Sequence, residues 1–486
     1  MNWIKKHRVL IIIVIFFATV YSLISLVNHY YFRTFALDLG VYTNALYDYA
    51  HFQWNDSSVF KEAGENLLAD HFDLYLFIFA PFSFIFGTYT LLILQIFFIL
   101  LGGIGVYKYF TLSSADKKIP LFAALYFYLF FGVFSALAFD YHSNVIAAMI
   151  VPWFFYFFKQ KKYIFSGVLF FLILISKENI ALWMLFVCIG LLFEYRKDRS
   201  SLLWLSAFAA FSILYFFLIT FVVMPAISSL GKYTHFDYSV LGGSFSEAFV
   251  YLISHPIRCI GILFTNHTSN PLGDYVKMEL HILLLVSGLF MLFRKPYFLI
   301  MLIPIYFQKL FHNDISMWSF ASQYNIEYAP IFAIGIFTII GSFKKKNLVN
   351  IFSVLVLVGV LATTVRIMDH TTYFTSKSRI RFYQASHYQK NYDVGFVYKQ
   401  MKEIPEDAVV SAQSPFLPHL ALRDKIYQFP IVKDADYIIF SPKENPYPLS
   451  KEDFDKQIQQ YKNSPDWQKK IDTGDLIVLK RISGLN

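Results

Sequence analysis

Long runs of apolar residues, separated by short polar or basic segments, recur along the first three quarters of the chain. Most of these runs approach the roughly 20 residues that a helix needs to cross the hydrocarbon core of a bilayer. The predicted spans are Val9–Val27, 89–110, 119–139, 143–158, 163–176, 180–193, 201–224, 280–293, 297–311, 326–343 and 348–366. The pattern therefore predicts a mainly α-helical polytopic membrane protein with eleven transmembrane helices.

A further apolar run, Phe72–Gly87, is short, contains Pro81 and lies almost directly before the next span. The positive-inside rule decides its placement, because Lys and Arg gather in short cytoplasmic loops. If this run does not cross the membrane, 17 basic residues fall in loops on one side and seven in outer segments before the tail. We therefore predict that Phe72–Gly87 is a re-entrant or juxtamembrane helix on the outer face, and that the N terminus is cytoplasmic.

Composition supports this membrane reading and divides the chain in two. The chain is 57% hydrophobic and 15% charged, which excludes an ordinary water-soluble protein. Charged residues become denser after residue 366. We expect a transmembrane domain over 1–366, with its first outer loop at 28–88, and a small extracytoplasmic α/β domain over 367–486. The predicted location is the cell (plasma) membrane, with many passes.

The sequence also argues against a nucleic-acid partner, a disulfide framework and a cleaved signal peptide. The basic residues lie in short clusters between apolar runs, as loop anchors do, so no nucleic-acid partner is implied. Two cysteines, Cys188 and Cys259, make no disulfide framework. The run Val9–Val27 follows a basic start and is long for a signal peptide, so we expect a retained membrane anchor.

Polar residues that carry chemistry gather in the predicted outer segments. The candidate site residues are Arg33, Asp38, Asp70, His71, Asp140, His142, Lys177, Glu178, His312, Gln323 and Tyr324. Each cluster alone is weak evidence, but charge near a bilayer is costly without a purpose. Their common side therefore predicts a functional site at the outer interface.

Asp38 begins a stretch whose apolar residues fall near helical spacing, as in an amphipathic helix lying on the membrane. A carboxylate there could act as a general base. Asp is also a favoured N-cap residue, so a purely structural role is the alternative.

Two tight outer turns likewise allow both a functional and a structural interpretation. Asp140 and His142 could hold a divalent metal, Mg or Mn, or relay a proton; alternatively, Asp140 and Ser143 only cap the next helix. Lys177, beside Glu178, could bind a phosphate, or its long side chain could reach to the interface and pair with its neighbour.

Several of these segments resemble a large prokaryotic family of polytopic membrane proteins of unknown function. The matching segments are the Asp38-Leu39-Gly40 helix start, Ala69-Asp70-His71-Phe72, Ala80-Pro81, Phe139-Asp140-Tyr141-His142, Ser176-Lys177-Glu178-Asn179, Tyr324 to Pro330, Val410 to Ser414, Pro418-His419-Leu420 and Asp436-Tyr437. The resemblance covers most of the chain. Leu37, where the family usually has Phe, and Asn179, where an acidic residue is common, are departures.

That family is similar in layout to the GT-C superfamily of glycosyltransferases, which includes protein O-mannosyltransferases and aminoarabinose transferases. The resemblance implies a polyprenyl-phosphate-linked sugar donor, with Asp38 at the position of the catalytic acidic residue. It also implies that the Asp70-His71 helix walls the donor site. Several of those enzymes carry an acidic dipeptide where this chain has Asp38-Leu39, which leaves the substrate open.

The sequence thus leads to one hypothesis with two rivals. The hypothesis is a membrane glycosyltransferase that moves a sugar from a polyprenyl phosphate to an envelope polymer, lipid or protein. Asp38 would be the base, and Lys177 and Arg33 would face the departing phosphate with His71 and His142 as donors. The rivals are a flippase of lipid-linked glycans, which would need polar or broken helices at the midplane, and a non-catalytic envelope assembly factor.

Overall fold

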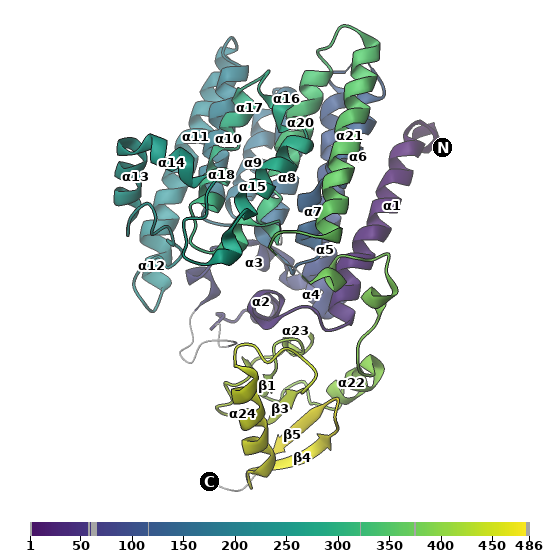
Figure 1. Ribbon diagram of the computed structural model, residues 1–486, viewed down its shortest axis with the longest axis vertical. Helices are drawn as coiled ribbons and strands as arrows, with labels where there is room; N and C mark the ends of the chain where they lie inside the picture. Colours follow the sequence, from purple (N-terminus) through teal and green to yellow (C-terminus); the bar gives the residue numbers. More distant parts are fainter. Residues whose placement is uncertain are drawn as a thin grey trace.

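A bundle of apolar helices stands on a small sheet domain in the computed structural model of the chain (Figure 1). The structure describes residues 2–56, 59, 66–114, 116–320, 322–373 and 376–482. The expectation of a mainly helical chain with a small C-terminal α/β part is confirmed.

Every apolar run predicted as a span is helical. The bundle helices are α1 (Asn2–Tyr30), α5 (Thr90–Thr111), α6 (Ile119–Leu129), α7 (Phe131–Leu137), α8 (Ser143–Lys159), α9 (Tyr163–Leu174), α10 (Ile180–Glu194), α11 (Arg199–Leu218), α12 (Met224–Ile227), α15 (Val276–Val286), α16 (Leu289–Leu292), α17 (Tyr297–Ile300), α18 (Ile303–Leu310), α20 (Tyr328–Ile340) and α21 (Lys346–Asp369).

Fewer of these helices are long enough to cross a bilayer by themselves. In the described part of the chain, four helical runs meet that requirement: His7–Tyr30, Tyr75–Thr111, Arg199–Ile227 and Lys346–Asp369. Together α6 and α7, bent by 43° at their junction, make a fifth. The others are shorter apolar helices, so the number of eleven spans stays a prediction.

The bend between α6 and α7 has a local cause and a local compensation. Phe130 adopts an extended backbone, with ψ of 129°, which interrupts the helix. The carbonyl oxygens of Tyr128 and Leu129 then accept hydrogen bonds from the hydroxyls of Tyr21 (2.7 Å) and Thr364 (2.5 Å). Side chains of neighbouring helices thus replace the lost backbone bonds, as is required in an apolar environment.

The segment predicted as re-entrant or juxtamembrane stays at the end of the bundle that faces the sheet domain. It forms α3 (Tyr75–Phe79) and α4 (Ser83–Phe86), which both contact α2 (Val41–Ala50). Gly87, with φ of 56° and ψ of −139°, separates α4 from the helical turn that leads into α5. Only from α5 onward does the chain run up through the bundle (Figure 1).

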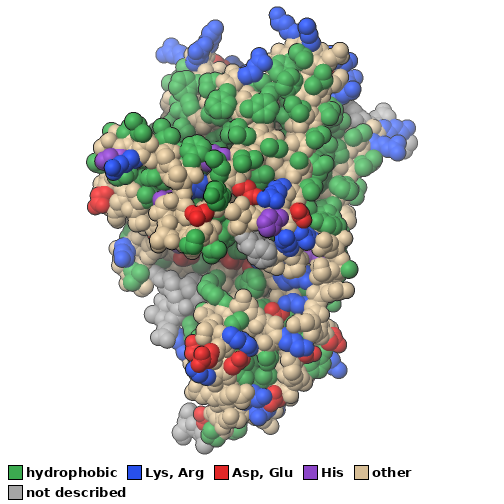
Figure 2. Space-filling view, viewed as in Figure 1, with side chains coloured by type: hydrophobic (Ala, Val, Ile, Leu, Met, Phe, Trp, Pro, Cys, Tyr) green, Lys and Arg blue, Asp and Glu red, His purple; other side chains and the backbone are tan. Residues whose placement is uncertain are grey.

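Charge is distributed unequally between the two ends of the bundle. Lys and Arg side chains project from the end away from the sheet domain, while the middle is covered by hydrophobic side chains (Figure 2). This separation matches the basic loops used in the sequence analysis. Which end faces the cytoplasm stays a prediction.

The C-terminal part is a five-stranded mixed sheet with strand order β2-β1-β3-β5-β4. The strands are β1 (Val410–Ala412), β2 (Ile426–Gln428), β3 (Tyr437–Phe440), β4 (Trp467–Asp472) and β5 (Ile477–Arg481), and the helices are α22 (Val394–Met401), α23 (Leu417–Leu420) and α24 (Lys451–Asn463). β1 pairs in parallel with β2 and β3, and the other pairs are antiparallel. The sequence does not predict β4, because this edge strand is mostly polar and exposed.

The hydrophobic core continues from the bundle into the sheet domain. Val410, Phe416 and Leu417 belong to the same buried cluster as the bundle helices. α23 contacts both α2 and the π-helix η1 (Ala36–Gly40). The expected boundary between 366 and 367 lies within the last turn of α21, and the division into two domains stays a prediction.

Candidate active site

Five segments meet where the bundle adjoins the sheet domain. They are η1, the loop 70–74, the turn 138–142, the turn 175–179 and the 3₁₀ helix η7 (Gln323–Asn325). Three of them are loops or turns between helices, and η1 and η7 are short helical turns of other than α type. Asp38 itself lies in a π-helical turn, an uncommon conformation that recurs at functional sites.

Asp38 faces His142 across the gap between η1 and the turn 138–142. The distance from Asp38 Oδ1 to His142 Nε2 is 3.3 Å, and the Asp38 side chain is 29% exposed. His142 is buried, its ring stacks on Phe139, and its backbone N–H donates to Gln95 Oε1 at 3.0 Å. The N-cap alternative for Asp38 is wrong, because Gly40 precedes α2 and no side chain caps that helix.

Asp140 is committed to structural contacts. One carboxylate oxygen accepts the backbone N–H of Phe35 (2.8 Å) and the other pairs with Arg379 Nη2 (2.9 Å). Burial raises the pKa of Asp140, while the Arg379 guanidinium opposes that rise. The helix-capping alternative for Asp140 and Ser143 is wrong as well, because no side-chain cap is formed at α8.

Glu178 anchors a second cluster. Its carboxylate accepts hydrogen bonds from the backbone N–H of Phe72 (3.2 Å) and the hydroxyl of Tyr233 (3.2 Å), and lies 3.5 Å from His71 Nδ1. Lys177 Nζ lies 3.1 Å from His71 Nε2. Burial, and then the charge of Lys177, lower the pKa of His71, which favours a neutral imidazole between ammonium and carboxylate. Burial alone would raise the pKa of Glu178, but the contact with His71 and the neighbouring positive charge lower it to about 2.

The sequence-predicted pair Asp70-His71 gains a third member, His235. The His71 and His235 rings stack with centroids 4.3 Å apart, and His235 Nε2 lies 3.2 Å from Asp70 Oδ1. Among the described residues, this trio forms the one group of three or more His, Cys, Asp or Glu side chains whose ligand atoms all lie within 4.8 Å of one another. Two imidazoles and a carboxylate suit Zn²⁺ or Mn²⁺ better than Mg²⁺.

Asp140 and His142 fit a metal less well. Both Asp140 oxygens already have partners, and His142 Nε2 faces Asp38 instead. The geometry therefore gives no support to the pair that the sequence suggests as metal ligands.

A cavity of about 480 Å³, which we name the histidine cavity, is lined by five of the eleven predicted site residues. Its polar lining comprises His71, Lys177, Glu178, Asn179, Tyr233, His235, Tyr238, Gln308, His312, Asp314 and Tyr324. Phe216, Phe245, Leu252 and Phe307 supply apolar walls. Gln323 lines a smaller adjoining pocket with Lys177 and Tyr324. The cavity thus combines a charged end with walls suited to hydrocarbon.

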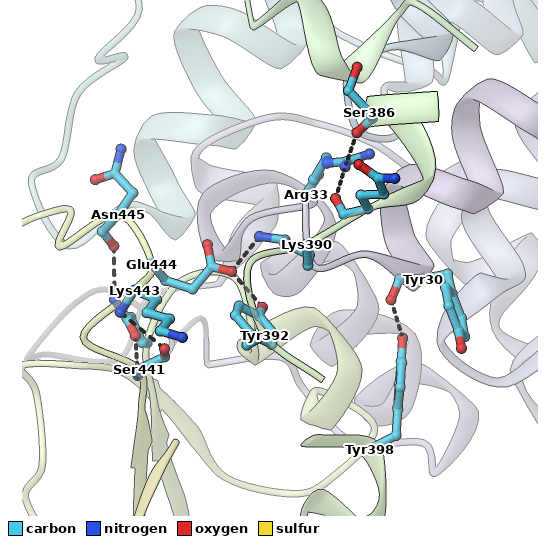
Figure 3. Close-up of polar contacts among 12 residues, drawn as sticks. Tyr30, Arg33, Ser386, Lys390, Tyr392, Tyr398, Ser441, Lys443, Glu444 and Asn445 are labelled. Atoms are coloured by element: carbon cyan, nitrogen blue, oxygen red, sulfur yellow. Dashed lines mark hydrogen bonds and ion pairs between the residues drawn. The ribbon is translucent and has the colours of Figure 1, made fainter. Parts of the chain in front are cut away.

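A second cavity, of about 640 Å³, lies between the bundle and the segment that leads to the sheet domain, and we name it the interdomain cavity. Its lining includes Arg33, Phe35, Ser135, Phe139, Ser376, Ser378, Arg379, Ser386, Gln389, Lys390, Asn391, Glu444 and Asn445. Apolar side chains of Phe32, Ala138, Phe320, Ile367 and Ile380 complete the lining. The Arg33 guanidinium donates to backbone carbonyls of residues 386, 387 and 389 (Figure 3).

Asp38 lies between the two cavities. Phe35 and Phe139, close to Asp38 in η1 and to its partner His142, line the interdomain cavity. Tyr324 lines the histidine cavity. Burial is the main cause of the raised pKa of its hydroxyl, and the negative charge of Asp38 raises that pKa further. The Asp38–His142 pair is therefore within electrostatic reach of both cavities.

The structure brings His71, Lys177, Glu178, His312 and Tyr324 to one cavity, with Asp70 and Gln323 beside it. Arg33 lies on the other cavity, and Asp38, Asp140 and His142 lie between the two. These contacts describe position, and the roles assigned to the residues stay predictions.

Three polar residues of this region are not among the sequence candidates. His235 lies in a long outer segment without a spacing signal, and Arg379 belongs to a basic cluster, 377–381, that departs from the charge bias. Asp73 is fully buried and accepts the Tyr75 N–H (2.9 Å) and the Tyr141 hydroxyl (3.3 Å). Burial raises the pKa of Asp73 to about 7.

Fold and site together define a polytopic membrane protein with a polar site at one end of its helical bundle. The chain belongs to the family described as "Predicted membrane protein (DUF2079)", which matches residues 28–478. The expected resemblance to the GT-C superfamily is confirmed for the fold.

That confirmation comes from a solved structure, the arabinofuranosyltransferase AftD from Mycobacteria. It superposes on 98% of this chain and 40% of its own, with a TM-score of 0.50 and 12% identity. This chain thus spans less than half the length of that protein. No curated protein sequence matches the chain.

Proposed function

We propose that this protein is a membrane glycosyltransferase that transfers a sugar from a polyprenyl-phosphate donor to an envelope glycan, lipid or protein on the outer face. The observation that carries the proposal is the position of Asp38. This carboxylate, paired with a buried histidine, lies between an apolar-walled cavity with a charged end and a second cavity that presents hydroxyl, amide and charged side chains. A lipid-linked donor and a hydrophilic acceptor have these two chemistries.

The histidine cavity suits the donor. Its aromatic and aliphatic walls would contact the isoprenoid, and α13 (Phe245–Ser254) contributes Phe245 and Leu252 to them. The opposite face of α13 exposes Phe249, Val250 and Ile253, as expected for a helix between the cavity and lipid. Lys177, with His71, would face the departing phosphate, where negative charge develops in the transition state.

Asp38 is proposed to take the proton from the acceptor hydroxyl. The partly exposed carboxylate can reach a substrate, while His142 holds one of its oxygens. An Nε2–H donated by His142 would orient the carboxylate and leave the second oxygen available. Direct attack of the activated hydroxyl on the donor sugar would invert its anomeric centre.

A divalent metal remains part of the proposal, at the Asp70, His71 and His235 trio. These residues lie at the polar end of the histidine cavity, next to Lys177. A bound ion would supply positive charge for the donor phosphate.

The proposal is tested by incubating the purified protein with a labelled polyprenyl phosphosugar and envelope glycan acceptors. Asp38→Asn should slow transfer roughly 10²-fold or more, because a positioned general base contributes about 10²–10⁴. Asp116→Asn, in the loop between α5 and α6 at the opposite end of the bundle, is the matched control. Chelation followed by Mn²⁺ addition, in the same assay, tests the metal.

Undiminished transfer by Asp38→Asn would reject the assigned base. Donor binding without turnover in the unmodified protein would instead favour an assembly factor. Scrambling of lipid-linked glycans in liposomes, without transfer, would favour the flippase.

A further inference from the structure

The interdomain cavity contains three basic side chains whose charges are not fully balanced. Lys390 pairs with Glu444, and Tyr392 donates to the same carboxylate at 2.5 Å (Figure 3). Arg379 pairs with Asp140. Each of these two ion pairs balances its own charges, and the third basic side chain, Arg33, belongs to neither of them.

Arg33 makes its hydrogen bonds to neutral groups. Its guanidinium donates to the carbonyl oxygens of His387 (2.6 Å), Gln389 (2.8 Å) and Ser386 (3.4 Å). The residue is 8% exposed. Burial, followed by the charge of Arg379, lowers the pKa of Arg33, so the two guanidinium groups repel each other at this cavity. Glu444 opposes this effect, but it is the one acidic side chain among the charged residues of the lining, against the basic Arg33, Arg379 and Lys390. A buried excess of positive charge is costly, which indicates that an anion completes the cavity.

Arg379 offers a further unused donor. Its guanidinium lies 5.2 Å from the ring centroids of both Phe35 and Phe139, which fix its plane. Its Nε is buried and, among the described residues, has no hydrogen-bond partner. A planar guanidinium with a free N–H is suited to a carboxylate or a phosphate.

The remaining lining indicates that the anion belongs to a saccharide. Ser378, Ser386, Gln389 and Asn391 place hydroxyl and amide groups around the cavity, which is the chemistry that sugar hydroxyls bind. Aromatic rings of Phe35 and Phe139 line the side nearest Asp38. Apolar side chains, among them Phe32, Phe320 and Ile367, form the rest of the lining.

We infer that the interdomain cavity binds an acidic glycan, whose carboxylate or phosphate group is held by Arg33 and Arg379. Its role as the acceptor in sugar transfer rests on the proposed function, whereas its binding does not. The anion would orient the saccharide so that a hydroxyl reaches the Asp38 side of the cavity. Specificity for acidic acceptors would follow from the unbalanced charge.

The test measures binding to the full-length protein in phosphatidylcholine nanodiscs, without turnover. The probes are oligogalacturonate, a phosphorylated oligomannose, neutral maltohexaose and undecaprenyl phosphate. We expect an acidic oligosaccharide to bind at least tenfold more tightly than maltohexaose, since hydrogen bonds between charged groups are stronger than those of neutral hydroxyls. Arg33→Gln should remove roughly that preference.

A charge change of opposite sign keeps the test decisive even if Arg33→Gln fails to fold. Glu444→Gln frees Lys390 from its carboxylate and should strengthen binding of the acidic probes several-fold, about the effect of one added charge. Glu452→Gln, on the exposed face of α24, is the matched control and should change nothing.

Equal binding of acidic and neutral oligosaccharides would overturn the inference, as would an unchanged affinity in Glu444→Gln. If the two variants alter binding of undecaprenyl phosphate but not of the acidic oligosaccharides, the anion is the lipid phosphate and the inference is wrong. If the unmodified protein binds the acidic oligosaccharides but transfers no sugar, the proposed function is rejected and the binding inference is retained.

Discussion

Glu178 is a buried carboxylate whose environment favours its charge. It accepts the Phe72 N–H and the Tyr233 hydroxyl, and it lies 3.5 Å from His71 Nδ1. Its folded-state pKa of about 2 lies below the ordinary value of 4.5. A group with a depressed pKa stabilises the fold above its ordinary pKa, and this stability is lost as the pH falls toward the folded-state value.

We therefore predict that acidification from about pH 4.5 to about pH 2 removes roughly 3 kcal/mol of unfolding free energy through Glu178. Glu178→Gln should be less stable than the unmodified protein at pH 7 and should lose less over this acid range. Thermal unfolding in detergent against pH measures both effects. Glu452→Gln, exposed on α24, is the control, and parallel pH curves for Glu178→Gln and the unmodified protein would contradict the prediction.

At the residue scale, the sequence predicted which polar side chains lie near the candidate site but not which side chains they contact. Asp140 and His142 suggest a metal pair because they are neighbours in sequence, yet Asp140 pairs with Arg379, which lies 239 residues later. No local pattern encodes that contact.

At the scale of elements, α7 and η7 approach each other closely near the candidate site. A Cβ on Gly132 would meet the backbone carbonyl of Asn325. Glycine at this position therefore allows η7, with Gln323 and Tyr324, to lie against the bundle and line the cavity wall.

Gly132→Ala should push η7 away from α7, because backbone atoms cannot move aside as a flexible side chain does. Overpacking of this kind costs about 1–3 kcal/mol, and donor affinity should fall as Tyr324 shifts. Thermal stability and donor binding are the measurements.

Gly261→Ala in α14 (Pro256–Ile262) is the control, because nothing lies within 4 Å of its added Cβ. It should be neutral or slightly stabilising. Equal stability and donor affinity in Gly132→Ala and the control would refute the close-packing argument.

At the scale of the whole molecule, the sheet domain is fixed to the bundle by buried polar contacts as well as by the shared core. Asn44 in α2 donates to the carbonyl oxygens of Ala421 (3.3 Å) and Arg423 (2.8 Å). Asn28 donates to the carbonyl of Arg379 (2.7 Å), and the N–H of Ala36 to Ser414 Oγ (3.1 Å).

We predict that Asn44→Ala lowers the unfolding free energy by about 1–3 kcal/mol, because two buried carbonyls lose their donor. Hydrogen exchange should rise around α23 and β2 before the bundle is affected. Asn463→Ala, exposed at the end of α24, is the control. Unchanged exchange at 417–428 in Asn44→Ala would show that the contact between the two parts does not depend on this side chain.

The sequence by itself determined the helical elements, the membrane class and the end of the molecule where the polar clusters lie. These follow from hydrophobic run length and charge bias, which are local properties of the chain. Even there it missed β4, because an exposed edge strand has no apolar pattern.

Tertiary structure decided which polar groups meet. It placed His235 beside Asp70 and His71, set Asp38 against His142, and brought Arg33 to the interdomain cavity with its hydrogen bonds made to carbonyl oxygens. These arrangements depend on how helices distant in sequence pack and bend, and the free energy of that packing is summed over many contacts that no short motif records.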